Sequence, residues 1–220
     1  MEAKKWQAVF LDRDGTINEE VGYLDRMEKL QLIPGAAEAN RLINKSGMKA
    51  VIVTNQSGVA RGVFDEAFVE KTHTHLRDIL RAEGALIDAF YFCPHHPTDG
   101  RVEYLKICDC RKPAPGMLLR AAEELRIDPL RSYMVGDTLK DIEAGARAGA
   151  QGILVRTGFG KEAAAELGPD EELRKNGDTM RHHVPIEKAG VQGETGIVRP
   201  VHIAGNLLAG VQWILRNRKP

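Results

Sequence analysis

Short apolar segments alternate along this chain with longer segments of helical periodicity, and this alternation restricts the possible folds more than any other feature. The apolar segments span residues 6–12, 48–54, 87–93, 132–137 and 152–157. Apolar residues at helical spacing predict helices over about 35–45, 65–81, 115–125 and 139–148. Strands joined by crossovers of this length can return parallel to one another. We therefore expect an α/β fold with a parallel sheet.

A single domain, residues 1–220, accounts for the length of the chain and can bury a full hydrophobic core. From about residue 158 to 199 the sequence is charged and glycine-bearing, with little apolar periodicity beyond one short helix, and we interpret it as a polar surface insertion. A last helix should then pack on the sheet, because its apolar residues share one face: Leu207, Leu208, Val211, Ile214 and Leu215.

Charge balance and cysteine count narrow the possible classes of function. Lysine plus arginine equals aspartate plus glutamate at 31 each, so no overall basic field favours nucleic acid or an anionic membrane. No apolar segment approaches the roughly 18 residues that a membrane span needs. Three cysteines, an odd number, favour reduced thiols over a disulfide framework. We expect a cytoplasmic protein. If its ligand is anionic, a few side chains at one site must hold it, because the chain has no net positive charge.

Two carboxylates follow the first apolar segment, in the stretch AVFLDRDGTI. Ligands of open parallel sheets bind beyond the carboxyl ends of the strands, so Asp12 and Asp14 stand where a site belongs. Alternate residues can point into one site, so we expect Arg13 to point away from it. Repulsion between the two carboxylates requires a cation or a shared proton, and Mg²⁺ suits oxygen ligands. The alternative is an Asx-turn in DRDG.

Three further strand ends carry polar groups. They contribute, in order, Thr54 with Asn55, Gln56 and Ser57; Arg111 with Lys112; and Asp137 with Asp141. Each group alone could be a turn, a helix cap or a solvated charge. Together they supply the nucleophile, the metal ligands and the donors that phosphoryl transfer requires. One aspartate would attack covalently, and its neighbour would handle the leaving-group proton with a pKa that crowding by another carboxylate can raise.

The motifs DxDGT, T, K and GDxxxD, in this order from about residue 9 to 155, resemble the haloacid dehalogenase (HAD) superfamily of phosphatases. The resemblance implies a Rossmann-like parallel sheet with helices on both faces, Asp12 as nucleophile, and Asp14 as general acid and then base. It also implies a Mg²⁺ site built from the Asp12 carboxylate, the Asp14 backbone carbonyl and Asp137. Thr54 and Lys112 would hold the transferred phosphoryl group.

The same resemblance places Asp141 in support of the metal site. No large cap domain is expected, because only 39 residues separate Asp14 from Thr54 and 57 separate Thr54 from Lys112. Short loops should therefore cover the site, chiefly residues 18–25, 56–63 and 93–110.

All three cysteines lie in the stretch CPHHPTDGRVEYLKICDC, residues 93–110. Its C-x-H and C-x-C pairs form a Cys₃His set that is typical of a closed, structural zinc site: Cys93, His95, Cys108 and Cys110. The alternative is that the cysteines are small buried hydrophobes, but HHPTDGR is too polar to bury. Zinc would hold this loop together and position the Arg111–Lys112 pair, without taking part in the chemistry.

Longer stretches, FLDRDGTIN, TNQSGVARG, CPHHP and CDCRKPAPGML, are similar to the capless, zinc-loop branch of the superfamily. This likeness implies a set of substrate-binding residues: Glu20, Val21, Gly22, Tyr23, Asn55, Gln56, Ser57 and Arg111. We expect a monomeric, Mg²⁺-dependent phosphatase of a small phosphorylated sugar, a sugar bisphosphate used for surface polysaccharide. The alternatives are a histidinol-phosphate phosphatase and a non-catalytic phosphosugar-binding protein.

Overall fold

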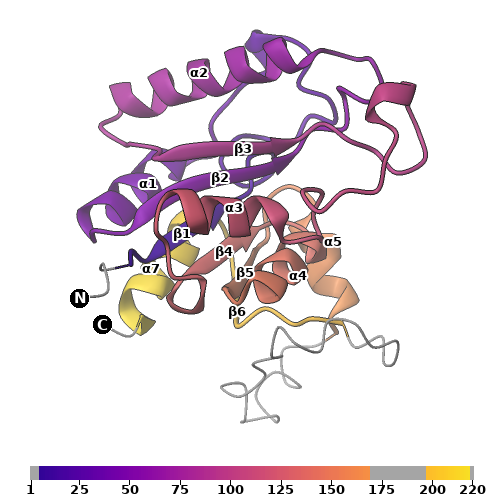
Figure 1. The fold of residues 1–220 in the computed structure, drawn as a ribbon. Helices are drawn as coiled ribbons and strands as arrows, with labels where there is room; N and C mark the ends of the chain where they lie inside the picture. The colour runs from indigo at the N-terminus through magenta and orange to yellow at the C-terminus, as the bar shows by residue number, and fades with distance from the viewer. Residues whose placement is uncertain (1–4, 169–196, 219–220) are drawn as a thin grey trace.

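The computed structural model describes residues 5–168 and 197–218, and within them the chain forms a six-stranded sheet (Figure 1). The strands are β1 (Ala8–Leu11), β2 (Lys49–Asn55), β3 (Ala89–Cys93), β4 (Tyr133–Gly136), β5 (Gln151–Val155) and β6 (His202–Ala204). They lie in the order β3-β2-β1-β4-β5-β6, and every neighbouring pair is parallel. The predicted α/β fold with a parallel sheet is confirmed.

Helices cover both faces of the sheet. They are α1 (Ala36–Lys45), α2 (Glu66–Ala82), α3 (Gly116–Glu124), α4 (Leu139–Ala148), α5 (Gly160–Glu166) and α7 (Leu207–Asn217). Successive residues of a strand point to opposite faces, so Val9 and Leu11 pack in one core cluster with α1, α2 and α7. Ala8 and Phe10 pack in a second cluster with α3 and α4, which lie in front of the sheet in Figure 1.

Three helices begin at side-chain caps that the sequence contains. At the start of α7, Asn206 accepts a hydrogen bond from the Ala209 amide at 3.0 Å. Asp65 precedes α2 and accepts a hydrogen bond from the Phe68 amide at 2.8 Å. Thr138 and Asp141 form a reciprocal capping box at the start of α4. Because α4 follows β4 after two residues, this cap also holds Asp141 at the carboxyl end of the sheet.

The structure differs from the expected elements at the ends of the strands and in one additional strand. Trp6 precedes β1 and forms an isolated bridge with Ile127, and β3 starts at Ala89, two residues later than expected. Strand β6 was not predicted. It has three residues, too few for an apolar pattern to show, and it becomes a strand by pairing with β5.

The expected polar insertion is only partly described. Near its start it forms α5, and Ala163 and Ala164 of this helix, with Leu167 directly after it, pack against Ile142 and Leu154. Residues 169–196 lie outside the described part of the chain. None of the described helices has the length and apolar character that a membrane span requires.

Candidate active site

The polar groups at the carboxyl ends of the strands surround one cavity with about 210 Å³ of space for solvent. Residues predicted from the sequence that line it are Asp12, Asp14, Glu20, Gly22, Tyr23, Thr54, Asn55, Gln56, Ser57, Arg111, Lys112, Asp137 and Asp141. Val21 does not line the cavity and is 39% exposed. Residues that line it but were not predicted are Leu24, Gly58, Phe64, Thr138, Lys140 and Phe159.

Lys112 lines the cavity and is buried between two acids. Its Nζ lies 2.9 Å from Asp12 Oδ1 and 2.6 Å from Asp141 Oδ1, and it donates to the Val53 carbonyl at 2.8 Å. Burial by itself lowers the pKa of Lys112, but the charges of Asp12 and Asp141 outweigh it and raise that pKa. Lys112 is therefore a fixed ammonium group that points at the Asp12 carboxylate.

The end of β2 determines where Lys112 lies. The Asn55 amide donates to the Lys112 carbonyl, and its Oδ1 accepts from the Lys112 backbone N–H, both at 3.0 Å. Asn55 was expected to bind substrate, but its side chain is already bonded on both sides to this backbone. The asparagine thus joins the end of β2 to the loop that leads into α3.

Asp12, Asp137 and Asp141 place carboxylate oxygens within 4.8 Å of one another. Burial, together with the charges of Asp141 and Asp14, outweighs Lys112 and raises the pKa of Asp12 to about 7. Burial and the charges of Asp12 and Asp141 raise the pKa of Asp137 to about 8. One lysine does not balance three acids, two of which are fully buried, so this group of oxygens suits a divalent cation.

Two of the three acids are free to bind such a cation. Asp141 Oδ1 lies against Lys112, and its Oδ2 accepts from the Thr138 N–H at 3.0 Å and from the Thr138 hydroxyl at 2.6 Å. Asp137 uses only Oδ2, which accepts from the Phe159 amide at 2.9 Å. Asp12 and Asp137 are thus the better ligands, and Asp141 holds Lys112 and the start of α4.

Two glycines make room for the Asp137 carboxylate. Gly15 and Gly158 have φ of +74° and +52°, and a Cβ at either position would lie 2.1 Å from Asp137 Oδ2. Only glycine combines this backbone conformation with the required space. The loops after β1 and β5 therefore approach closely at the acidic cluster.

Asp14 has a different environment from the other acids. Its carboxylate accepts from Arg13 Nη2 at 2.8 Å, from Asn18 Nδ2 at 2.9 Å and from Gln56 Nε2 at 2.9 Å. Burial alone raises the pKa of Asp14, but the Arg13 charge and these hydrogen bonds together hold it below its ordinary value. The expectation that crowding raises this pKa is wrong, because Asp14 is closer to donors than to other acids.

As expected, Arg13 does not line the cavity, but its side chain stays in contact with Asp14. Its side chain is 2% exposed and folds back onto the carboxylate of the next residue. The alternation rule describes the direction of Cβ, whereas the long, flexible arginine side chain can turn back toward its neighbour.

Arg61 connects the loops that cover the cavity. It donates to the Tyr23 hydroxyl at 2.5 Å and forms an ion pair with Asp99 at 3.0 Å. Tyr23 also meets Phe64 edge-on, with ring centroids 6.4 Å apart. Phe64 was not predicted, since nothing in the sequence distinguishes it from a core residue, and its contact with Tyr23 exists only in the fold.

The Cys₃His set forms a second cluster, beyond the end of β3. Cys110 Sγ lies 3.1 Å from Cys93 Sγ, 3.2 Å from Cys108 Sγ and 3.4 Å from His95 Nδ1. All four ligand atoms lie within 4.8 Å of one another, so that one tetrahedral metal ion could contact all of them. A hydrogen bond from Cys93 lowers the pKa of Cys110 to about 5, which favours the metal-binding thiolate.

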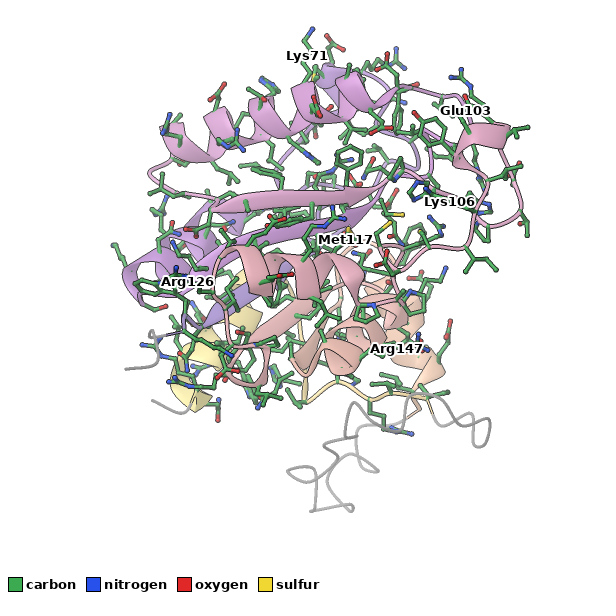
Figure 2. The ribbon with its side chains drawn as sticks, viewed as in Figure 1. Lys71, Glu103, Lys106, Met117, Arg126 and Arg147 are labelled. Carbon is green, nitrogen blue, oxygen red and sulfur yellow. The ribbon has the colours of Figure 1, made fainter. Side chains whose placement is uncertain are left out.

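This cluster lies at the base of the loop that carries Glu103 and Lys106 (Figure 2). The outgoing and returning segments of the loop are joined by two backbone hydrogen bonds. The His96 N–H donates to the Tyr104 carbonyl, and the Lys106 N–H donates to the His96 carbonyl. Arg111 directly follows the cluster and donates to the His95 carbonyl at 3.0 Å. The cluster therefore links the loop to Arg111 and Lys112, which both line the cavity.

Comparisons with known proteins place these sites in context. Residues 109–176 match the model of the HAD-hydrolase-like family. The D-glycero-beta-D-manno-heptose-1,7-bisphosphate 7-phosphatase of Salmonella typhi is 45% identical over 177 residues, which cover 80% of this chain and 94% of that protein. The protein of the same name from Escherichia coli K12 is 44% identical over 177 residues, which cover 80% of this chain and 93% of that protein.

A solved structure also resembles the whole chain. It is the D,D-heptose 1,7-bisphosphate phosphatase of B. bronchiseptica complexed with magnesium and phosphate, with a TM-score of 0.74 and 29% identity. The alignment covers 96% of this chain and 98% of that one. Sequence and backbone comparisons thus agree on one group of proteins.

Proposed function

Because the chain belongs to the HAD-like family of D-glycero-beta-D-manno-heptose-1,7-bisphosphate 7-phosphatases, we propose that it removes the 7-phosphate of that sugar through an aspartyl-phosphate on Asp12. The chain is a phosphoric monoester hydrolase, and the expected sugar-bisphosphate phosphatase is favoured over the histidinol-phosphate alternative. The observation that carries the residue roles is the buried Asp12–Lys112 pair on the wall of the cavity.

Asp12 is the proposed nucleophile. Its Oδ attacks the phosphorus, a new O–P bond forms, and the bond from phosphorus to the sugar oxygen breaks. Lys112 and the Thr54 hydroxyl hold the equatorial oxygens while negative charge develops on them. Thr54 Oγ1 accepts from Gln56 at 2.9 Å, which leaves its hydroxyl hydrogen for a phosphate oxygen.

Asp14 is the proposed proton-transfer group. A phosphate dianion in the cavity raises the pKa of this carboxyl by repulsion, which allows Asp14 to carry a proton. The proton passes to the departing sugar oxygen. Asp14 then accepts a proton from the water that attacks the aspartyl-phosphate, so that phosphate leaves and Asp12 is restored.

We propose that Mg²⁺ is held by the Asp12 and Asp137 carboxylates and the Asp14 backbone carbonyl. Three observations support this site: the excess of negative charge in the cluster, the free carboxylate oxygens, and the absence of side chains at Gly15 and Gly158, which lets the Asp137 carboxylate lie against both loops. The chemistry that the ion supplies when bound is neutralisation of phosphate charge.

We propose zinc for the cluster of Cys93, His95, Cys108 and Cys110, since three thiols and an imidazole form a preferred zinc set. The remaining proposals concern the chain as a whole: a single-domain monomer in the cytoplasm, where thiols stay reduced. Its partner would be the phosphorylated sugar, with no nucleic acid or membrane involved.

Phosphate release in Mg²⁺ tests the substrate. Both anomers of heptose 1,7-bisphosphate are compared with histidinol phosphate and fructose 1,6-bisphosphate at matched concentrations. We expect a preference for one heptose anomer of about a hundredfold, equivalent to about 2.7 kcal/mol of transition-state binding. Equal turnover of all four compounds would contradict the proposed substrate.

A further inference from the structure

Arg13 is a fully charged side chain that is buried beside the proposed proton-transfer group. A buried guanidinium needs partners for its donors. Nε and Nη2 meet the Asp14 carboxylate at 3.2 and 2.8 Å. On the opposite side, Nη1 lies 3.3 Å from Nε2 of His73, a residue of α2 that is 60 positions away in the sequence.

His73 is held rigidly in a neutral form. It is 5% exposed, it stacks on Phe90 with ring centroids 4.8 Å apart, and it meets Phe92 edge-on at 5.8 Å. Burial, and next the Arg13 charge, lower its pKa to about 3. A guanidinium can only donate, so Nε2 of the neutral ring accepts and Nδ1 carries the proton.

The guanidinium group is planar, so its orientation is transmitted from one edge to the other. When His73 holds Nη1, the plane in which Nε and Nη2 meet Asp14 is set. Asn18 and Gln56 contact the same carboxylate, but neither carries a charge. Arg13 is therefore the strongest of the groups that orient Asp14.

From this chain of contacts we propose that His73 is a positioning residue for proton transfer, acting on Asp14 through Arg13. The inference rests on the proposed role of Asp14 as general acid and base. His73 does not line the cavity, and its effect should therefore appear in the proton-transfer step and not in substrate binding.

The leaving group distinguishes this role from a purely structural one. A sugar alkoxide needs a proton as it departs, whereas p-nitrophenolate leaves without one. The ratio kcat/KM reports the steps through departure of the leaving group. A misplaced Asp14 should therefore lower kcat/KM for heptose 1,7-bisphosphate more than for p-nitrophenyl phosphate.

The experiment measures kcat and KM with both substrates for a set of variants. We expect His73→Leu, which has no acceptor, to lower kcat/KM for the bisphosphate by about tenfold or more. The KM for the bisphosphate, and kcat/KM for p-nitrophenyl phosphate, should each change by less than about threefold. His73→Gln, whose amide oxygen can replace Nε2, should stay within about threefold of the wild type. His75→Leu, on the exposed side of the same helix, is the matched control.

Equal losses with both substrates, or a His73→Leu variant that behaves like His75→Leu, would overturn the proposal. If His73→Leu does not fold, Arg13→Lys takes its place, because an ammonium group cannot reach both partners in one plane, and it should show the same dependence on the leaving group. Asp14→Asn is the reference. If Asp14→Asn shows no such dependence, the proposed role of Asp14 fails, and this result is distinct from failure of the link through His73.

Discussion

At the scale of single residues, the acidic cluster of Asp12, Asp137 and Asp141 is destabilising, because burial and mutual repulsion disfavour the ionised carboxylates that the proposed chemistry uses. Asp12 is largely buried, and among the described residues it pairs with one positive charge, that of Lys112. Its pKa of about 7 means that folding disfavours the ionised form. Removal of this charge should therefore affect activity and stability in opposite directions.

We expect Asp12→Asn to lower kcat by roughly a thousandfold or more, because the amide cannot form the aspartyl-phosphate. In EDTA the same variant should gain about 1 kcal/mol in free energy of unfolding, because repulsion within the cluster is relieved. Phosphate release and thermal unfolding measure the two effects. Unchanged phosphate release would remove Asp12 from its proposed role.

His73 should make folding stability depend on pH. Its pKa is lowered from 6.5 to about 3 in the folded protein, so the unfolded chain binds more protons between these values. The buried, neutral His73 therefore makes its full contribution to the free energy of unfolding above pH 6.5, and this contribution is lost as the pH falls. Between pH 7 and pH 5, the wild type should lose about 2 kcal/mol more free energy of unfolding than His73→Gln.

Urea unfolding at the two pH values checks this prediction. His75→Gln is the control, since His75 lies exposed on the same helix. Equal losses in the wild type and His73→Gln would mean that His73 is not held in its neutral form.

At the scale of elements, the loop after β3 depends on its Cys₃His cluster. The loop has exposed apolar side chains, with Val102 at 85% and Ile107 at 91%, so a hydrophobic core does not hold it. The cluster lies directly before Arg111 and Lys112. Loss of the metal should therefore affect the site as well as the loop.

A pair of neighbouring histidines provides the test. We expect His95→Ala to lose most of the bound zinc and at least about tenfold in kcat/KM, because the metal then lacks one of four ligands. His96→Ala should keep close to one zinc per chain, since His96 is not part of the cluster. Metal analysis after purification without added zinc measures the difference, and a zinc-free, fully active wild type would refute the site.

At the scale of the whole molecule, the cavity is assembled from segments that are far apart in the chain. β1, β2 and β4 and the loops after them supply most of its polar groups. A ligand that bridges two of these segments stabilises the folded state as a whole, because it does not bind the unfolded chain in the same way.

Mg²⁺ should therefore raise the midpoint of thermal unfolding. At a hundredfold excess over its Kd the ion contributes about 2.7 kcal/mol, or roughly 5 to 10 °C for a chain of this size. Asp137→Asn should abolish most of this shift, and Asp78→Asn, on the exposed side of α2, should retain it. A full shift in Asp137→Asn would exclude Asp137 as a ligand.

Local sequence patterns were sufficient to predict the parallel sheet and the residues that meet at its carboxyl edge. The apolar segments define the strands, and parallel strands end at the same edge, so Asp12, Thr54 and Asp137 had to come together. The Cys₃His set was recognisable because its members are close in sequence. These predictions needed only local pattern and the rule of parallel connection.

The tertiary structure alone decided the partners of each side chain. β6 is a strand because β5 lies beside it, and Phe64 lines the cavity next to Tyr23, which its ring meets edge-on. The ion pair of Arg13 with Asp14 helps to lower a pKa that was expected to be raised, and the contact of Arg13 with His73 was not predicted. Such contacts depend on side-chain rotamers and on packing between distant elements, which residue spacing does not specify.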